Sequence, residues 1–128
     1  MIFTRHLASA ALILACCGAA SAQTRPGLAA LTYDQEDVVT AWIWAQHLEA
    51  SCPTWRLNTG LRDYAFVQLD LRAADFSAGG KFGRRYAQYK KNAAAQLSQV
   101  KPGKLCDIPS EFYGPSGSWA KNWMVERR

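Results

Sequence analysis

Apolar positions recur at steps of three and four between residues 32 and 52, which is the period of one face of an α-helix. These positions are Val38, Ala41, Trp42, Ala45, Leu48 and Cys52. Thr32 and Gln35 have the spacing of a capping box, and three acidic residues in the first turn suit the positive end of the helix dipole. Pro53 ends the pattern. We therefore predict a helix that places Cys52 in the core.

A second helical pattern covers residues 58–69, with Asn58 or Thr59 as its cap. Its apolar face contains Leu61, Tyr64, Ala65 and Leu69. Over residues 65–71, apolar residues also occupy every second position, Ala65, Val67, Leu69 and Leu71, which is the period of a strand. No second strand with suitable turn chemistry is available to pair with that segment, so we predict a helix and keep the strand as the alternative.

A connection over residues 70–80 separates the second helix from a third. Phe76 is expected to enter the core, and Gly79 and Gly80 break the periodicity. From Lys81 to Gln99 the helical pattern returns, and Pro102 with Gly103 stops it. The side chains that we expect this helix to bury are Phe82, Tyr86, Ala93 and Leu97.

The last segment predicts a short helical turn, in which Asp107 is the cap, Pro109 lies in the first turn and Gly114 marks the end. A turn follows over residues 115–118, and then Trp119 and Trp123 lie one helical turn apart, a spacing typical of core or interface packing. The fold class that we predict is all-α: a small bundle of three to four helices held by one disulfide.

The N-terminal residues have the features of a signal peptide: one cation at Arg5, an apolar stretch over residues 7–17, and small residues before Gln23. We expect cleavage after residue 22 and a single domain over residues 23–128 with no transmembrane span. A membrane anchor is one alternative, although the apolar stretch is shorter than the roughly 20 residues a span needs. A lipoprotein acylated at Cys16 is another.

Two cysteines, Cys52 and Cys106, remain after the expected cleavage. In an oxidising compartment such a pair predicts a disulfide, which would stabilise the fold by about 4 kcal/mol on the chain-entropy model. The pair is not a Cys-x-x-Cys motif, so we expect a structural role. Periplasmic or secreted localisation follows from the leader and the cysteines together.

The chain resembles small uncharacterised exported proteins of Gram-negative bacteria that contain two cysteines. The features that carry the resemblance span most of the mature chain: the end of the first helix at Ser51-Cys52-Pro53, Asp75-Phe76 followed by Gly79-Gly80 and Phe82, and a second cysteine shortly before Tyr113-Gly114-Pro115-x-Gly117. The resemblance implies an all-helical, disulfide-bonded periplasmic protein of unknown function. Pro109 departs from the pattern, in which a proline-free helix follows the second cysteine.

Candidate chemistry for catalysis is sparse. His47 is the single histidine after the expected cleavage, and its place between two apolar helix positions predicts a packed or partly exposed imidazole. With both cysteines bonded, the ligands for a zinc site are missing, and the acidic residues of the first helix are explained by the helix dipole. We therefore expect a non-enzymatic protein without cofactor or metal.

Charge is distributed unevenly along the 128 residues, whose formal net charge is +5. Seven acidic and three basic residues lie between residues 34 and 75, whereas residues 81–104 contain seven basic residues and no acidic one. The residues that this pattern predicts to bind an anionic partner are Lys81, Arg84, Arg85, Tyr86, Tyr89, Lys90 and Lys91. The alternative is that these cations dock on the acidic first helix within the same molecule.

The function that these observations favour is an exported binding or envelope-associated protein. Its expected partners are anionic lipid, lipopolysaccharide or an acidic protein, and nucleic acid is not expected in that compartment. A periplasmic chaperone of the acid-stress type is the alternative, because such proteins are also small, helical and held by one disulfide.

Overall fold

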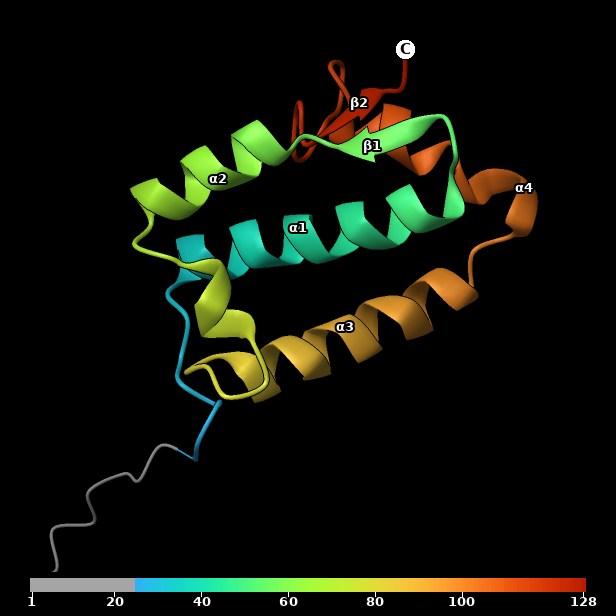
Figure 1. Ribbon diagram of the computed structural model, residues 1–128. Helices are drawn as coiled ribbons and strands as arrows, with labels where there is room; N and C mark the ends of the chain where they lie inside the picture. The colour runs from blue at the N-terminus through green and yellow to red at the C-terminus, as the bar shows by residue number, and fades with distance from the viewer. Residues whose placement is uncertain (1–24) are drawn as a thin grey trace, which may run out of the picture.

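The structure is a computed structural model that describes residues 25–128, and it is mostly helical (Figure 1). The expected signal peptide and Cys16 lie outside the described residues. Within residues 25–128, no helix is both long enough and apolar enough to span a membrane.

The helix α1 (Tyr33–Ser51) runs through the middle of the molecule. In Figure 1, α2 (Thr59–Gln68) and β1 (Trp55–Leu57) follow one side of α1, and α3 (Gly83–Ser98) follows the other. Contacts between α1 and each of these three elements agree with that view. The longest apolar helix is therefore the centre on which the other elements pack.

The predicted capping box of α1 is confirmed. The Thr32 amide donates to Gln35 Oε1 at 3.0 Å, and the Gln35 amide donates to Thr32 Oγ1 at 3.2 Å. The side chain of Gln35 also donates to the carbonyl of Leu69 at 2.9 Å, which ties the start of α1 to the end of α2. Cys52 follows α1 and is fully buried, as its place in the apolar pattern predicted.

Five aromatic side chains pack together around Trp42, in the middle of α1, and we call them the aromatic cluster. They are Trp42, Phe66, Phe76, Phe82 and Tyr86, with centroid distances of 4.9 to 5.7 Å between neighbouring rings. The cluster joins α1, α2, α3 and a short 3₁₀ turn, η1 (Ala73–Phe76). The expectation that Phe76 enters the core is confirmed, since it is 5% exposed.

The alternative of a strand over residues 65–71 is wrong. Residues 65–68 belong to α2, which places Phe66 in the core and leaves Val67 75% exposed. A helix is favoured over a strand here because it turns the large side chain of Phe66 toward the other aromatic rings of the core.

The third helix, α3, begins two residues later than predicted, at Gly83. Phe82 and Ala93 are buried as expected, and Tyr86 and Leu97 are half-buried. A Cβ atom on Gly83 would clash with the carbonyl oxygen of Ser77, so the first turn of α3 can lie against the preceding loop only with glycine at that position.

The chain after α3 differs from the prediction. Pro102 does not simply end helical structure; it begins α4 (Pro102–Leu105), because proline is compatible with the first turn of a helix. The turn expected near Pro109 is a single π-helical turn, η2 (Pro109–Tyr113), which closes with the Gly114 amide donating to the Pro109 carbonyl at 2.6 Å.

A two-stranded antiparallel sheet is present, so the all-α expectation holds only roughly. β1 pairs with β2 (Met124–Glu126) in the register Arg56 opposite Val125. The tail therefore continues as a strand rather than a helix, and Asn122, with φ of +66°, turns the chain into it. Trp123 is buried at 7% exposure, whereas Trp119 is 50% exposed and meets Tyr113 edge to face.

Candidate functional site

Four of the predicted cations are exposed beside or on α3: Lys81, Arg84, Lys90 and Lys91. We call these four residues the basic face. Arg84 and Lys91 are two turns apart and share one side of α3, whereas Lys90 lies on a neighbouring side and Lys81 lies just before the helix begins. Lys90 lies over the ring of Tyr86, with Nζ 4.6 Å from the ring centroid, a cation–π arrangement that keeps the ammonium group at the surface.

Arg85 differs from the expectation that it points outward. Its Nε donates to the carbonyl of Ala29 at 2.7 Å, and its Nη2 donates to the carbonyl of Leu28 at 3.0 Å. Its backbone amide donates to the carbonyl of Gly27 at 3.0 Å. Arg85 therefore fixes the segment before α1 onto α3 and is not a free member of a binding surface.

Tyr86 was expected both among the side chains that the helix buries and in the anion-binding set, and its ring belongs to the aromatic cluster. It stacks on Trp42 with a centroid distance of 4.9 Å, and its hydroxyl donates to Gln46 Oε1 at 3.2 Å. Burial raises the pKa of Tyr86, while the hydrogen bond with Gln46 and the charge of Arg62 oppose that rise. The helical spacing predicted this packing, and the place of Tyr86 among the cations does not make it part of a binding surface.

Tyr89 is half-buried and lines a cavity of about 150 Å³ between α1 and α3. Trp44 and Ile43 line the same cavity from α1, and Asn92 and Gln96 line it from α3. Tyr89 thus contributes to the contact between the two helices. The aromatic residues between the cations of α3 serve packing, and the anion-binding prediction now depends on the basic face.

The acidic residues of α1 do not neutralise the basic face. Three ion pairs occur within residues 25–128: Arg62–Asp63 at 2.7 Å, Lys81–Asp75 at 3.9 Å and Lys104–Asp107 at 3.7 Å. None of them joins α3 to α1, and the acidic residues at the start of α1 are exposed. The alternative in which the two helices dock through their charges therefore has no ion pair to support it in the described part of the chain.

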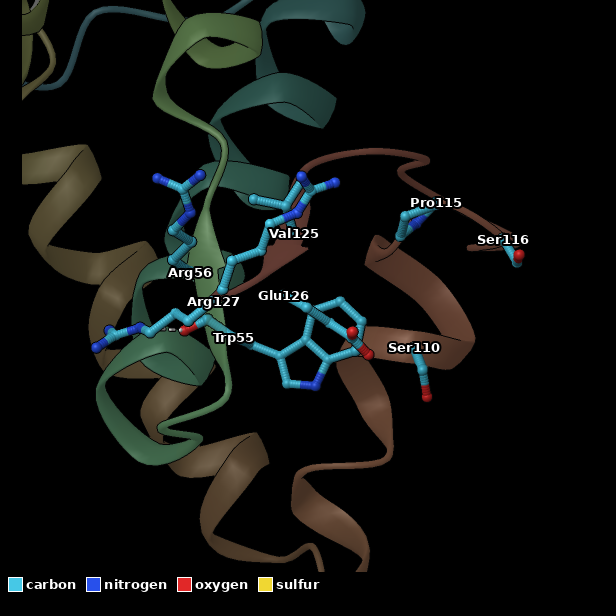
Figure 2. Close-up of a pocket in the computed structure, with 9 residues that line it drawn as sticks. Trp55, Arg56, Ser110, Pro115, Ser116, Val125, Glu126 and Arg127 are labelled. Carbon is cyan, nitrogen blue, oxygen red and sulfur yellow. Dashed lines mark hydrogen bonds between the residues drawn. The ribbon is translucent and has the colours of Figure 1, made fainter.

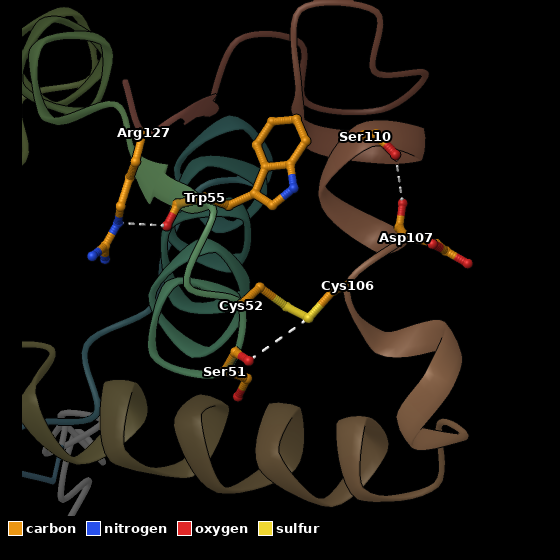
Figure 3. The surroundings of a disulfide bond; sticks show 7 residues. All are labelled: Ser51, Cys52, Trp55, Cys106, Asp107, Ser110 and Arg127. Atoms are coloured by element: carbon orange, nitrogen blue, oxygen red, sulfur yellow. Dashed lines mark hydrogen bonds between the residues drawn. A yellow bond between two sulfur atoms is a disulfide. The ribbon is translucent and has the colours of Figure 1, made fainter.

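The predicted disulfide between Cys52 and Cys106 is confirmed (Figure 3). It joins the end of α1 to the residue that follows α4, with a Cα–Cα distance of 5.5 Å. Ser110 lies just beyond it in η2, and its hydroxyl donates to the Asp107 carbonyl at 3.0 Å. The bond holds the C-terminal part of the chain against the central helix.

His47 is half-buried on α1, and its Nε2 has no hydrogen-bond partner among residues 25–128. The described residues contain no group of three histidine, cysteine or acidic side chains arranged to hold a metal ion. The geometry around His47 therefore provides no partner that would orient it as a base.

Sequence reasoning missed one feature, a groove of about 700 Å³ beside β2 (Figure 2). Its lining residues come from both strands and from the C-terminal loop: Trp55, Arg56, Ser110, Pro115, Ser116, Val125, Glu126, Arg127 and Arg128. The paired arginines of the tail were visible in the sequence, but only the pairing of β1 with β2 brings Arg56 to them. No family model matches the chain, and neither the curated proteins nor the solved structures include a match to it.

Proposed function

We propose that this is an exported, non-enzymatic binding protein that attaches to phosphate-bearing lipid surfaces of the cell envelope through the basic face. One observation carries the proposal: four exposed cations lie on or beside α3, and within residues 25–128 a single carboxylate, that of Asp75, lies within 4 Å of any of them. A group of exposed cations along a helix leaves a positive potential toward solvent.

The expected strength follows from the number of cations. Each lysine or arginine near an anionic membrane surface contributes about 1 kcal/mol, so the basic face supplies about 4 kcal/mol, which is reversible attachment and not anchoring. Salt screens this attraction over about 8 Å at physiological ionic strength. Binding should therefore weaken steeply as salt is added.

Two features support export. The disulfide between Cys52 and Cys106 is of the kind that persists in oxidising compartments. The leader expected in the first 22 residues would direct the chain there. Lipid headgroups and lipopolysaccharide are the abundant anionic surfaces of such a compartment, and both present phosphate.

Vesicle co-sedimentation tests the proposal with protein that has been exported and purified from cells. Vesicles of zwitterionic lipid with about one third phosphatidylglycerol are compared with purely zwitterionic ones. The test variant is Arg84→Gln/Lys90→Gln/Lys91→Gln, and Arg85 is left intact because it fixes the segment before α1. The control variant is Lys101→Gln/Lys104→Gln/Lys121→Gln, which removes the same charge from other exposed positions.

We expect the test variant to bind anionic vesicles at least tenfold more weakly, since it lacks about 3 kcal/mol of attraction. The control should lose less than threefold. Equal losses would mean that net charge alone drives attachment, and unchanged binding of the test variant would refute the basic face as the site.

A further inference from the structure

The groove is lined by residues of both strands and of the C-terminal loop. Residues 125–128, in the last part of β2 and just after it, line one wall together with Trp55 and Arg56 of β1. Ser110, Pro115 and Ser116 line the opposite wall (Figure 2). The ring of Trp55 lies between the two walls, covered by Gly114, where a Cβ atom would come within 3.1 Å of the ring.

At the edge of β2 that faces away from β1, the backbone groups of Glu126 are exposed, whereas Met124 is fully buried. The Asn58 amide donates to the Trp123 carbonyl at 2.8 Å, and the Arg127 amide donates to the Thr54 carbonyl at 2.8 Å. In an antiparallel pair these bonds alternate, so the N–H and C=O of Glu126 point away from β1. Within residues 25–128, no residue outside the two strands hydrogen-bonds to the Glu126 amide.

At the other edge of the sheet, along β1, backbone groups already have hydrogen-bond partners within the fold. The Leu57 amide donates to the carboxylate of Glu49 on α1, and the Trp55 amide donates to the Cys52 carbonyl at 3.0 Å. The Trp55 carbonyl accepts from Nε of Arg127 at 3.2 Å. The fold satisfies these three outward backbone groups of β1 internally and leaves those of Glu126 on β2 open beside the groove.

The side chains that line the groove carry a net positive charge. Arg56, Arg127 and Arg128 line it together with one acidic residue, Glu126. None of the three arginines forms an ion pair with a carboxylate in the described part of the chain. Arg56 and Arg127 lie on one side of the strands, and Trp55, Glu126 and Ser110 lie on the other (Figure 2).

We infer that this groove binds an extended acidic segment of another protein, which adds to β2 as a third strand. Main-chain hydrogen bonds to Glu126 would hold the segment in place, and its acidic side chains would meet the arginines. Because side chains alternate across a strand, acidic residues at every second position would all face the side of Arg56 and Arg127. The volume of about 700 Å³ is in the range that takes a short peptide.

This site is separate from the basic face. α1 lies between α3 and the sheet in Figure 1, and α1 contacts both α3 and β1. The inference therefore does not depend on the proposed attachment to lipid, and variants at one site leave the other intact.

Fluorescence anisotropy with labelled peptides tests the inference. The probes are eight-residue peptides that alternate glutamate with threonine, glutamine with threonine, and lysine with threonine. We expect the glutamate peptide to bind at least tenfold more tightly than the glutamine peptide, and the lysine peptide not to bind. Arg56→Gln/Arg128→Gln should weaken the glutamate peptide at least tenfold, and the matched control Arg84→Gln/Lys91→Gln on the basic face should leave its affinity unchanged.

Strand addition is distinguished from simple charge attraction at Glu126. The variant Glu126→Pro removes the outward N–H, which an edge strand tolerates, and should abolish peptide binding. Glu126→Gln keeps the N–H and should bind the acidic peptide more tightly. In the parent protein, hydrogen exchange of the Glu126 amide should slow at least tenfold when the glutamate peptide is added.

Three outcomes would overturn the inference. The first is equal binding of the glutamate and glutamine peptides. The second is an unchanged exchange rate at Glu126 in the presence of bound peptide. The third is displacement of the peptide by inorganic pyrophosphate at equal concentration, which would identify a site for small phosphate-bearing anions instead. Vesicle binding measured on the same variants reports separately on the basic face.

Discussion

The middle and the C-terminal end of α1 are held to the rest of the molecule by different means. Around Trp42, in the middle of α1, the aromatic cluster packs side chains of α1, α2, η1 and α3 against one another. At the C-terminal end, buried apolar side chains such as Leu57 and Met124 are joined by covalent and polar contacts: the disulfide, the ladder between β1 and β2, and the bond from the Leu57 amide to Glu49. We call the second group of contacts the C-terminal clasp.

The difference shows which contacts each region needs to fold. The aromatic cluster is built by helices whose apolar faces exist before they meet, so burial of the rings is the main driving force there. The strands of the clasp are three residues each and have no such preference of their own. Their pairing depends on the cross-link and on the helix that supports them.

Removal of the disulfide is the largest expected effect. In the variant Cys52→Ala/Cys106→Ala, the unfolded chain gains the freedom that a cross-link over 54 residues had removed, and the free energy of unfolding should fall by about 4 kcal/mol. Urea denaturation measures it.

Hydrogen exchange measured on the same variant tests whether the clasp and the aromatic cluster depend on the disulfide to different degrees. Amides of β1 and β2 should lose protection more than those of α2 and α3. Equal loss in all four elements would show that the aromatic cluster and the clasp unfold as one cooperative unit.

The second effect concerns the aromatic cluster. Phe76 lies 5.4 to 5.7 Å, between centroids, from the rings of Trp42, Phe66, Phe82 and Tyr86. The variant Phe76→Leu keeps most of the apolar volume but loses these ring contacts, and we expect a loss of about 2 kcal/mol in urea denaturation. Tyr64→Leu is the control, because Tyr64 is 63% exposed on α2. A loss below 0.5 kcal/mol in both variants, roughly the size of ordinary surface effects, would contradict the cluster's role.

The third prediction, whose effect on stability at neutral pH is the smallest, compares the two regions by the alkaline titration of one tyrosine in each. Burial raises the pKa of Tyr113, beside the clasp, and that of Tyr86, in the cluster, where a hydrogen bond and a nearby arginine oppose the rise. The unfolded phenol ionises near pH 10, before the folded one, so the free energy of unfolding should fall as the pH rises above about 10. Below that pH the contribution is fully present.

Tyr113→Phe removes the ionisable group and keeps the ring. Urea denaturation between pH 7 and pH 11.5 should therefore show a shallower alkaline loss for Tyr113→Phe than for the parent, with stability at pH 7 changed by less than about 0.5 kcal/mol. Tyr86→Phe should flatten the alkaline loss less. Tyr33→Phe serves as the control at a position that is 80% exposed. A larger flattening in Tyr86→Phe than in Tyr113→Phe would mean that the cluster, and not the clasp, holds the more strongly shifted phenol.

The helices and the disulfide could be predicted from the sequence because both depend on local or compositional signals. The capping residues Thr32 and Asn58 and the apolar spacing of α1 are readable within a few residues of each other. The strands could not be predicted, since β1 and β2 are three residues each and are separated by 66 residues of other structure. Neither strand alternates long enough to display a period.

The candidate site was predicted in part. The exposure of Lys81, Arg84, Lys90 and Lys91 agrees with the helical pattern. Arg85 does not, because its role depends on the carbonyls of Leu28 and Ala29, which lie 57 and 56 residues away along the chain. The groove beside β2 could not be foreseen once the strands had been missed.

The two cysteines of the disulfide differ in exposure, and this asymmetry bears on how the bond exchanges with external thiols. Cys52 is fully buried, whereas Cys106 is exposed. If an incoming thiolate attacks Sγ of Cys106, the leaving group is the sulfur of Cys52, which would form as an anion in an apolar core. Because a desolvated thiolate is a poor leaving group, we expect exchange to require opening of the end of α1. The rate of that opening, and not the exposure of Cys106, should then control how long the disulfide survives in the presence of thiols.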